Sequence, residues 1–125
     1  MSLKSYRDLD IWKRSCTMVT TVYSATSEFP KREMFGLTRQ IRRAAVSVPS
    51  NIAEGAARLY TREYIRFLSN ALGSIAELET QLIVSVDLGY TNQERIEHIF
   101  QELDQIGRMI RRLVQRSEER LATNR

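Results

Sequence analysis

Hydrophobic residues recur every three or four positions along almost the whole chain, and this spacing divides it into four segments. The repeat is typical of amphipathic helices that bury one stripe. Asp8 is expected to cap the first helix, and Pro30 ends it, because the residue before a proline avoids the helical conformation. The first helix is therefore predicted over residues 8–27. Its stripe consists of Leu9, Trp12, Cys16, Val19, Tyr23 and Thr26.

The next two segments repeat the pattern. The second helix is predicted over residues 31–58, as one continuous helix rather than two shorter ones, because the apolar spacing continues across Pro49. The third is predicted over residues 62–88, with Thr61 as its N-cap and Gly89 ending it. The stripe of the second is Met34, Leu37, Ile41, Ala44, Val48 and Ile52, and that of the third is Tyr64, Leu68, Ala71, Ile75, Leu78 and Leu82.

The fourth segment begins with the capping-box pattern Thr91-x-x-Glu94. The residues from Leu121 onward are expected to fray. Four helices with short connections predict an all-α, antiparallel up-down-up-down four-helix bundle, and no segment has the alternation of a β-strand. The bundle is expected to be a single domain over residues 1–125, with its core over 6–121. The stripe of the fourth helix is Ile96, Ile99, Leu103, Ile106, Ile110 and Leu113.

Two helices carry an additional apolar row beside the main stripe. Such rows are either a broad core-facing surface or an interface between subunits, and the residues alone leave both open. Ile65, Leu72 and Ile83 are the candidate interface residues. The rows are Ile11, Met18, Val22 and Phe29 in the first helix, and Ile65, Leu72, Ala76 and Ile83 in the third.

The second helix contains an unusual stretch around Pro49. A proline inside a helix costs about 3 kcal/mol and cannot donate a hydrogen bond, here to the Ala45 carbonyl. The sequence predicts a kink at Pro49, with Ser47, Ser50 or Asn51 supplying or positioning another partner for that carbonyl.

Two further residues of this stretch have candidate roles. Gly55, with alanines around it, allows another backbone to come close. Glu54 is interpreted as a partner for nearby backbone or for Arg58, and alternatively as a buried catalytic acid.

Residues 47–55 read Ser-x-Pro-Ser-Asn-Ile-Ala-Glu-Gly, and this stretch resembles the bacterial 23S rRNA intervening-sequence protein family. The likeness covers about residues 6–112 and includes Leu88-Gly89-Tyr90. It implies a small cytosolic four-helix bundle that assembles as a ring of five. A related branch comprises accessory proteins of diversity-generating retroelements, which are basic and work with nucleic acid and a reverse transcriptase. The resemblance implies a fold but no reaction.

The chain lacks the residue sets that catalysis or metal binding requires. One cysteine, Cys16, and one histidine, His98, cannot build a zinc site or an internal disulfide, and the Glu-x-x-His pairs of di-iron bundles are absent. We therefore expect no enzyme activity, no cofactor and no metal. The longest uncharged run, residues 15–27, is too short and polar to span a membrane, and the start lacks a signal-peptide core, so a cytoplasmic location is expected.

The net charge of +4 is unevenly distributed. An up-down-up-down bundle gathers the starts of helices one and three and the ends of two and four at one end, which would be about five charges positive. The basic residues there are Lys4, Arg7, Lys13, Arg14, Arg58, Arg62, Arg66, Arg111, Arg112, Arg116 and Arg120. The acidic ones are Asp8, Asp10, Glu54, Glu63, Glu118 and Glu119.

This basic end has two interpretations. Phosphate backbones would bind it through counterion release, with Tyr60 and Tyr64 adding stacking. Alternatively it is a solvated helix end whose arginines complement the dipole of the fourth helix. The candidate nucleic-acid-binding residues are Arg58, Arg62, Arg66, Arg111, Arg112 and Arg116.

A second basic group is expected to form ion pairs, within or between subunits. It consists of Arg39, Arg42 and Arg43, and its expected partners at the start of the fourth helix are Glu94, Glu97, Glu102 and Asp104.

Three hypotheses follow. The first is a non-enzymatic homo-oligomer, a pentamer by resemblance, that binds RNA or DNA through its basic end. The second is a protein–protein interaction scaffold without a nucleic-acid role. The third is an enzyme built around Glu54, which requires a cleft that holds Glu54, Asn51 and Ser50 together.

Overall fold

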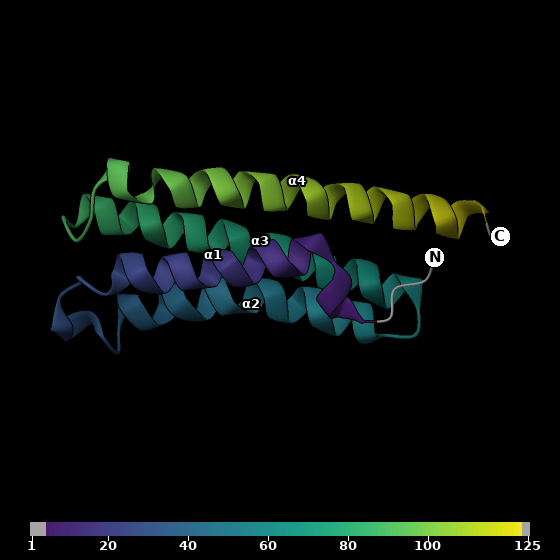
Figure 1. Cartoon of the computed structure of the whole chain (residues 1–125), viewed down its shortest axis with the longest axis horizontal. Helices are drawn as coiled ribbons and strands as arrows, with labels where there is room; N and C mark the ends of the chain where they lie inside the picture. The colour runs from purple at the N-terminus through teal and green to yellow at the C-terminus, as the bar shows by residue number, and fades with distance from the viewer. Residues whose placement is uncertain (1–4, 124–125) are drawn as a thin grey trace.

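The computed structural model describes residues 5–123, and these form four α-helices with no strand among them. Successive helices lie side by side and run in opposite directions (Figure 1). The predicted antiparallel four-helix bundle is confirmed. The α-helices are α1 (Asp10–Thr26), α2 (Leu37–Ala57), α3 (Thr61–Asp87) and α4 (Gln93–Thr123), and two short 3₁₀ helices are η1 (Tyr6–Asp8) and η2 (Lys31–Glu33).

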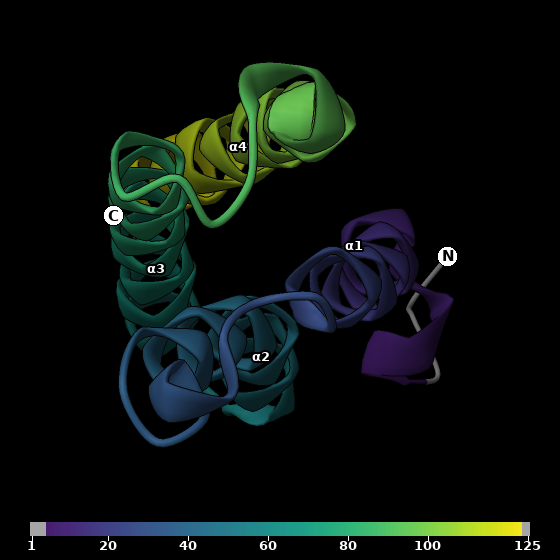
Figure 2. The ribbon, with the colours of Figure 1, turned by 90° about the vertical axis from the view of Figure 1, so that its left-hand side faces the viewer.

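Seen along its axis, the bundle has one helix at each corner of a square (Figure 2). The most extensive contact joins α2 and α3, and every helix also packs against its other neighbour in the square. Within residues 5–123, the diagonal pairs α1–α3 and α2–α4 do not come close to each other. The backbones of α2 and α4 therefore do not pack against each other, and only long side chains can meet across that diagonal.

The predicted stripes of α2, α3 and α4 form most of the core. Met34 is an exception, because it precedes α2 in the turn after η2 and is 47% exposed. Leu37, Tyr64 and Leu113 are half-buried at the ends of their stripes. The buried members are Ile41, Ala44, Val48 and Ile52 in α2, Leu68, Ala71, Ile75, Leu78 and Leu82 in α3, and Ile96, Ile99, Leu103, Ile106 and Ile110 in α4.

The predicted core stripe of α1 is only partly right: Thr26 is buried and Leu9, Trp12 and Val19 pack against the core, but the neighbouring row supplies most of the fully buried side chains. Met18 and Val22 are buried, whereas Tyr23 is 42% exposed and Cys16 is half-buried. Both rows are apolar at the same spacing. Polar residues can join the buried row because they bond to their own helix: the Ser15 hydroxyl donates to the Ile11 carbonyl at 2.6 Å. The second apolar row of α1 is therefore core-facing.

Three predicted N-caps are wrong by one or two residues. Asp8 belongs to η1, and Leu9 precedes α1 without a side-chain cap. Thr61 is the first residue of α3. At α4 the Asn92 side-chain oxygen, not Thr91, accepts a hydrogen bond, from the Arg95 N–H at 3.0 Å. Leu9 and Tyr60 thus precede α1 and α3 without a side-chain cap, and only at α4 does a neighbouring polar residue take the position.

The C-terminal ends agree better with prediction. Gly89 has a φ of 79° and ends α3, while the Tyr90 N–H donates to the Ser85 carbonyl at 2.9 Å and the Gly89 N–H donates to Val86 at 3.0 Å. This is the Schellman arrangement, and glycine tolerates its left-handed residue best. The helix α4 continues past Leu121 to Thr123, and fraying of this last turn remains a prediction. Residues 124–125 lie outside the described chain.

Helix α2 runs through the buried Pro49, which confirms one continuous helix across the proline. The expected partner for the Ala45 carbonyl is not found among the described side chains. The Ser47 hydroxyl instead lies 2.8 Å from the Ala44 carbonyl and 2.6 Å from the Ser74 hydroxyl, which links α2 to α3. The Asn51 amide donates to the Ser47 carbonyl at 2.8 Å. A kink at Pro49 remains a prediction.

Candidate nucleic-acid interface

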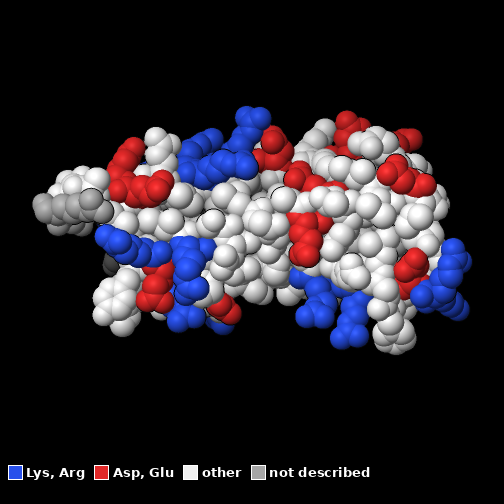
Figure 3. Space-filling model, turned by 180° about the vertical axis from the view of Figure 1, so that it is seen from behind, with Lys and Arg blue, Asp and Glu red and all other residues white. Residues whose placement is uncertain are grey.

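The antiparallel order brings the starts of α1 and α3 and the ends of α2 and α4 to one end of the bundle, where α4 extends beyond the other helices (Figure 1). We call this the basic end. Lys4 lies outside the described residues, which leaves ten basic and six acidic residues of the predicted set. Lysine and arginine side chains gather over this end, with acidic ones among them, and a second basic group lies toward the other end (Figure 3).

One candidate site at the basic end is a cavity of about 360 Å³ between the α2–α3 turn and the end of α4. Three arginines line it: Arg58, Arg116 and Arg120. Tyr60 and Tyr64 also face it, and no acidic residue belongs to its lining. We call it the polar-end cavity. It concentrates positive charge beside aromatic rings.

Gly55 determines how closely α2 and α3 approach beside this cavity. A Cβ atom at residue 55 would lie 2.8 Å from the Phe67 Cβ and 3.3 Å from the Tyr64 carbonyl oxygen, which is closer than packed atoms tolerate. The turn after α2 then leaves Leu59 91% exposed and Tyr60 68% exposed. The small residue predicted to permit close backbone contact therefore does so.

Arg112 and Arg116 line a smaller neighbouring cavity of about 220 Å³, together with Asp10. The carboxylate makes this second cavity less positive than the polar-end cavity. Arg116 lies between the two, because it lines both. Arg58, Arg112 and Arg116 are thus the predicted phosphate-binding residues that the fold brings together.

A fourth predicted arginine, Arg66, shares an aromatic ring with Arg58. The guanidinium groups of Arg58 and Arg66 each lie 4.8 Å from the centre of the Phe67 ring. Arg58 also lies 3.9 Å from the Glu63 carboxylate, with both side chains partly exposed. Such exposed pairs are weak, so Arg58 keeps most of its capacity to bind an anion.

The remaining two predicted arginines lie outside both cavities. Arg62 and Arg111 are exposed. Arg111 lies beside Gly107 and close enough to Glu79 to favour its ionised form, although burial raises the pKa of Glu79 overall. Arg111 therefore lies beside Glu79 of α3, away from both cavities. Arg120 is predicted at the basic end but is not one of the six candidate nucleic-acid-binding residues. It nevertheless lines the polar-end cavity.

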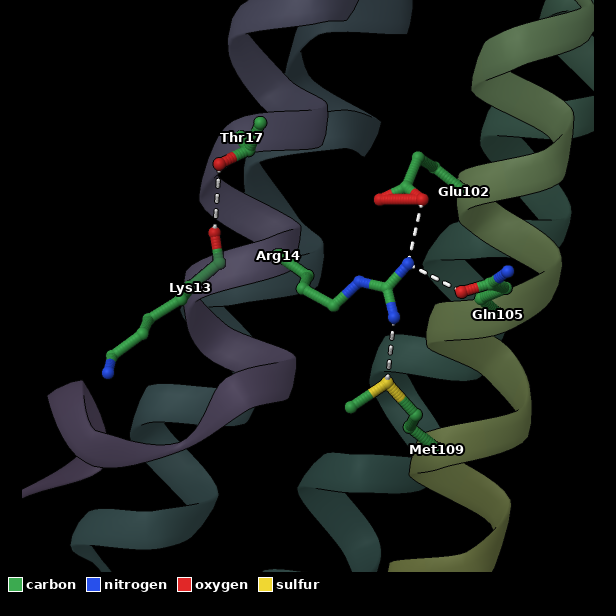
Figure 4. A network of polar contacts seen from close by, with 6 residues as sticks. All are labelled: Lys13, Arg14, Thr17, Glu102, Gln105 and Met109. Carbon is green, nitrogen blue, oxygen red and sulfur yellow. Dashed lines mark hydrogen bonds and ion pairs between the residues drawn. The ribbon is translucent and has the colours of Figure 1, made fainter.

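Arg14 is neutralised within the bundle. Its guanidinium donates to the Glu102 carboxylate at 2.8 Å and to the Gln105 side-chain oxygen at 2.6 Å, and lies 3.7 Å from the Met109 sulfur (Figure 4). These bonds connect α1 to α4. Arg14 thus contributes to the fold rather than to the free charge of the basic end.

The predicted ion pairs between the second basic group and α4 are wrong within one chain. Arg42 donates to the Thr26 hydroxyl at 3.0 Å and lies 4.5 Å from the centre of the Tyr23 ring. The acids of α4 pair elsewhere, Glu102 with Arg14 and Asp104 with Arg108 at 3.1 Å. The reason is that α2 and α4 are diagonal. Pairing between subunits remains a prediction.

The residues of the enzyme hypothesis do not form a cleft. Ser50 and Glu54 are exposed on α2, and neither lines the cavities of the basic end. Arg58 pairs with Glu63, so the predicted Glu54–Arg58 pair is also wrong. Burial raises the pKa of the Cys16 thiol, which makes it a poorer nucleophile at neutral pH. Because Glu54 is exposed, it is not the buried acid that the enzyme hypothesis requires.

The part of the chain that the structure describes contains neither a metal-binding cluster nor a membrane-spanning helix. No group of three or more His, Cys, Asp and Glu residues there is placed to hold a metal ion. No helix between residues 5 and 123 combines the length and the apolar character needed to cross a membrane. His98 is exposed, as expected for a surface residue.

The model of the family described as 23S rRNA-intervening sequence protein matches residues 7–112. The chain belongs to this family. The match includes α1, α2, α3 and most of α4, and it confirms the resemblance seen in the Ser47–Gly55 stretch. Arg116 and Arg120 lie beyond the matched residues, so part of the polar-end cavity is built by this chain's own C-terminal turns. A comparison with curated proteins finds no match.

Proposed function

We propose that this protein is a non-enzymatic, homo-oligomeric four-helix bundle that binds RNA or DNA through its basic end. The observation that carries the proposal is the polar-end cavity, where Arg58, Arg116 and Arg120 meet without an acidic residue in the lining. Arginine suits phosphate because its planar guanidinium offers several donors in a fixed geometry.

The arrangement of the arginines suits a phosphate partner. Arg58 follows the end of α2, across the cavity from Arg116 and Arg120 of α4, so one anion in the cavity would be approached by guanidinium groups from two helices. Neutralising several phosphates at once releases their counterions, which is the main source of affinity in nonspecific nucleic-acid binding.

The homo-oligomer is supported by apolar surface on the outer side of α3. Ile83 is 51% exposed, Val84 is 40% exposed and Leu88 is 55% exposed. Leu72, another candidate interface residue, is half-buried and packs toward Gly107 of α4, while Ile65 is half-buried. Five subunits are proposed from the family resemblance. A ring would present several basic ends together and multiply the phosphate contacts.

Fluorescence anisotropy with labelled RNA across a salt series tests the proposal. We expect binding that weakens steeply with salt, as counterion release requires. The double variant Arg112→Glu/Arg116→Glu should lose most of this affinity and flatten the salt dependence. Arg39→Glu/Arg43→Glu is the matched control, because it makes the same charge change at exposed positions near the start of α2. Equal losses in both variants would contradict binding through the basic end.

A protein partner is the second candidate, favoured by adjacent exposed side chains in the α2–α3 turn. Leu59 is 91% exposed and Tyr60 is 68% exposed. Contiguous exposed apolar surface is typical of protein contact sites. A pull-down from nuclease-treated lysate distinguishes the two functions. A scaffold should retain its protein partner, and so should its variant Arg111→Glu/Arg112→Glu. A nucleic-acid-binding protein should lose those proteins that RNA had connected to it.

A further inference from the structure

We propose that the polar-end cavity binds one unpaired nucleotide, with its base against Tyr60 and its phosphate on Arg116 and Arg120. This inference rests on the proposed function and makes it more specific. It predicts that the basic end prefers single strands over duplexes. The cavity volume of about 360 Å³ lies within the range of small-ligand sites.

The shape and lining of the cavity suit a group that is flat and apolar on one side and anionic on the other. Leu9 and Leu113 supply apolar surface. Gly55 and Ala56 are small, so they leave space on the α2 side of the cavity. The buried Ser117 also belongs to the lining, so the wall of α4 carries a small polar residue between its arginines.

Two tyrosines provide rings for stacking. Tyr60 is 68% exposed, in an extended conformation just before α3, so its ring can move over a base at little cost. Tyr64 is held more firmly, because it packs against the core, and burial raises the pKa of its phenol. Bases stack on aromatic side chains with little dependence on sequence, because every base has a flat face.

The charged groups around the cavity suit a phosphate beside that base. The guanidinium of Arg120 is close enough to the Tyr64 phenol to oppose the rise of its pKa, which places positive charge next to a ring. The start of α3 also faces the cavity, and no side chain caps it. Its free N–H groups add to the positive potential made by the three arginines.

A base-paired nucleotide cannot enter such a site. Its base is stacked between neighbours, and its edges are used in pairing. Proteins that read unpaired nucleotides instead receive bases that are splayed out of the strand. The cavity therefore distinguishes single strands from duplexes, while the exposed arginines outside it, Arg62 and Arg111, attract both forms equally.

The test uses the full chain, a short single-stranded RNA with one 2-aminopurine, and the duplex of the same strand. We expect Tyr60→Ala to weaken single-strand binding about tenfold and to leave duplex binding within about twofold. The wild type should quench 2-aminopurine fluorescence by stacking, and Tyr60→Ala should not. Because Tyr60 is exposed, the variant should fold normally, which circular dichroism can verify.

A matched pair of arginine variants separates the cavity from the general charge of the basic end. Arg116→Ala/Arg120→Ala removes two charges from the cavity, and Arg62→Ala/Arg111→Ala removes two charges outside it. We expect the first to reduce single-strand binding well beyond the second. If both weaken single strands and duplexes alike and Tyr60→Ala has no effect, the nucleotide site is refuted while the proposed function stands. If the wild type binds neither RNA at low salt, both fail.

Discussion

At the scale of single residues, Gly55 shows how one missing side chain shapes both the packing and the site. The Phe67 Cβ and the Tyr64 backbone occupy the space that a larger residue would need, and both belong to α3. Neither can move away without displacing the helix. The contact between α2 and α3 is the most extensive in the bundle, so its spacing also fixes one wall of the polar-end cavity.

Gly55→Ala should therefore lower the free energy of unfolding by about 1–3 kcal/mol, the usual cost of an overpacked core. Gly73→Ala is the control, because nothing lies within 4 Å of a Cβ atom there and the residue is exposed inside α3. It should raise the free energy of unfolding by about 0.5–1 kcal/mol through helix propensity. Urea denaturation measures both. A Gly55→Ala protein as stable as the wild type would show that the close approach is not needed.

At the opposite end, one carboxylate joins two loops. Glu33 accepts a hydrogen bond from the Tyr90 hydroxyl at 2.6 Å and one from the Leu37 N–H at 3.1 Å. These bonds, that of Tyr90 first, lower the pKa of Glu33 from its ordinary value of 4.5, while the same bond raises the pKa of Tyr90 above 10.0. The folded protein thus favours the ionised carboxylate and the protonated phenol.

The pair makes stability depend on pH in a definite direction. The contribution of Glu33 is complete above pH 4.5 and is lost as pH falls through its lowered pKa. That of Tyr90 is complete below pH 10.0 and is lost as pH rises through its raised pKa. Tyr90→Phe should reduce both losses, measured by urea denaturation from acid to alkaline pH. Tyr23→Phe, whose ring lies under Arg42, should keep the wild-type profile. Superimposable profiles for wild type and Tyr90→Phe would contradict this account.

At the scale of helices, the pattern of apolar residues predicted the stripes of α3 and α4 correctly, that of α2 apart from Met34, and that of α1 only in part. In α4 a single row carries the large aliphatic residues, so only one face can be buried. In α1 two adjacent rows are equally apolar, and the choice depends on which row reaches the neighbouring helices. Sequence periodicity gives the spacing of a stripe but not its direction when two rows compete. The cap predictions failed because a polar residue near a helix start need not cap it. Leu9 and Tyr60 precede α1 and α3 without a side-chain bond, and Asn92 rather than Thr91 caps α4.

Arg14 is the polar connection between α1 and α4, and its removal should loosen that contact. We expect Arg14→Ala to lower the free energy of unfolding by about 1 kcal/mol, a modest value because its side chain is 36% exposed and that of Glu102 is 25% exposed. Arg108→Ala is the control, because it breaks only the exposed pair with Asp104 within α4 and should cost about 0.3–0.5 kcal/mol. A double-mutant cycle of Arg14 and Glu102 without measurable coupling would rule out the connection.

At the scale of the whole molecule, topology predicted the basic end but not the cavity in it. Counting charges on antiparallel helices is enough to place Arg58 and Arg116 at the same end. The cavity depends on the Gly55 contact and on the length of α4, which extends beyond its neighbours (Figure 1). The bond between Arg14 and Glu102, which removes the Arg14 charge from the basic end, could not be predicted either, because the two residues lie far apart in the sequence.

The proposed assembly also belongs to the scale of the whole molecule. Ile83→Asp places a charge in the exposed apolar surface of α3, and we expect it to shift the oligomer toward monomers in multi-angle light scattering, because a buried unpaired charge is costly. Val46→Asp, at a position of α2 that is 40% exposed, is the matched control and should leave the mass unchanged. If Ile83→Asp keeps the wild-type mass, this surface of α3 is not the interface.

The central claim is that nucleic acid binds at the basic end, and hydrogen–deuterium exchange with and without single-stranded RNA tests it most directly. We predict slower exchange in the α2–α3 turn around Tyr60 and in the last turns of α4 around Arg116, with no change near Glu33 at the opposite end. Slower exchange near Glu33 alone, or no change anywhere at saturating RNA, would contradict the account.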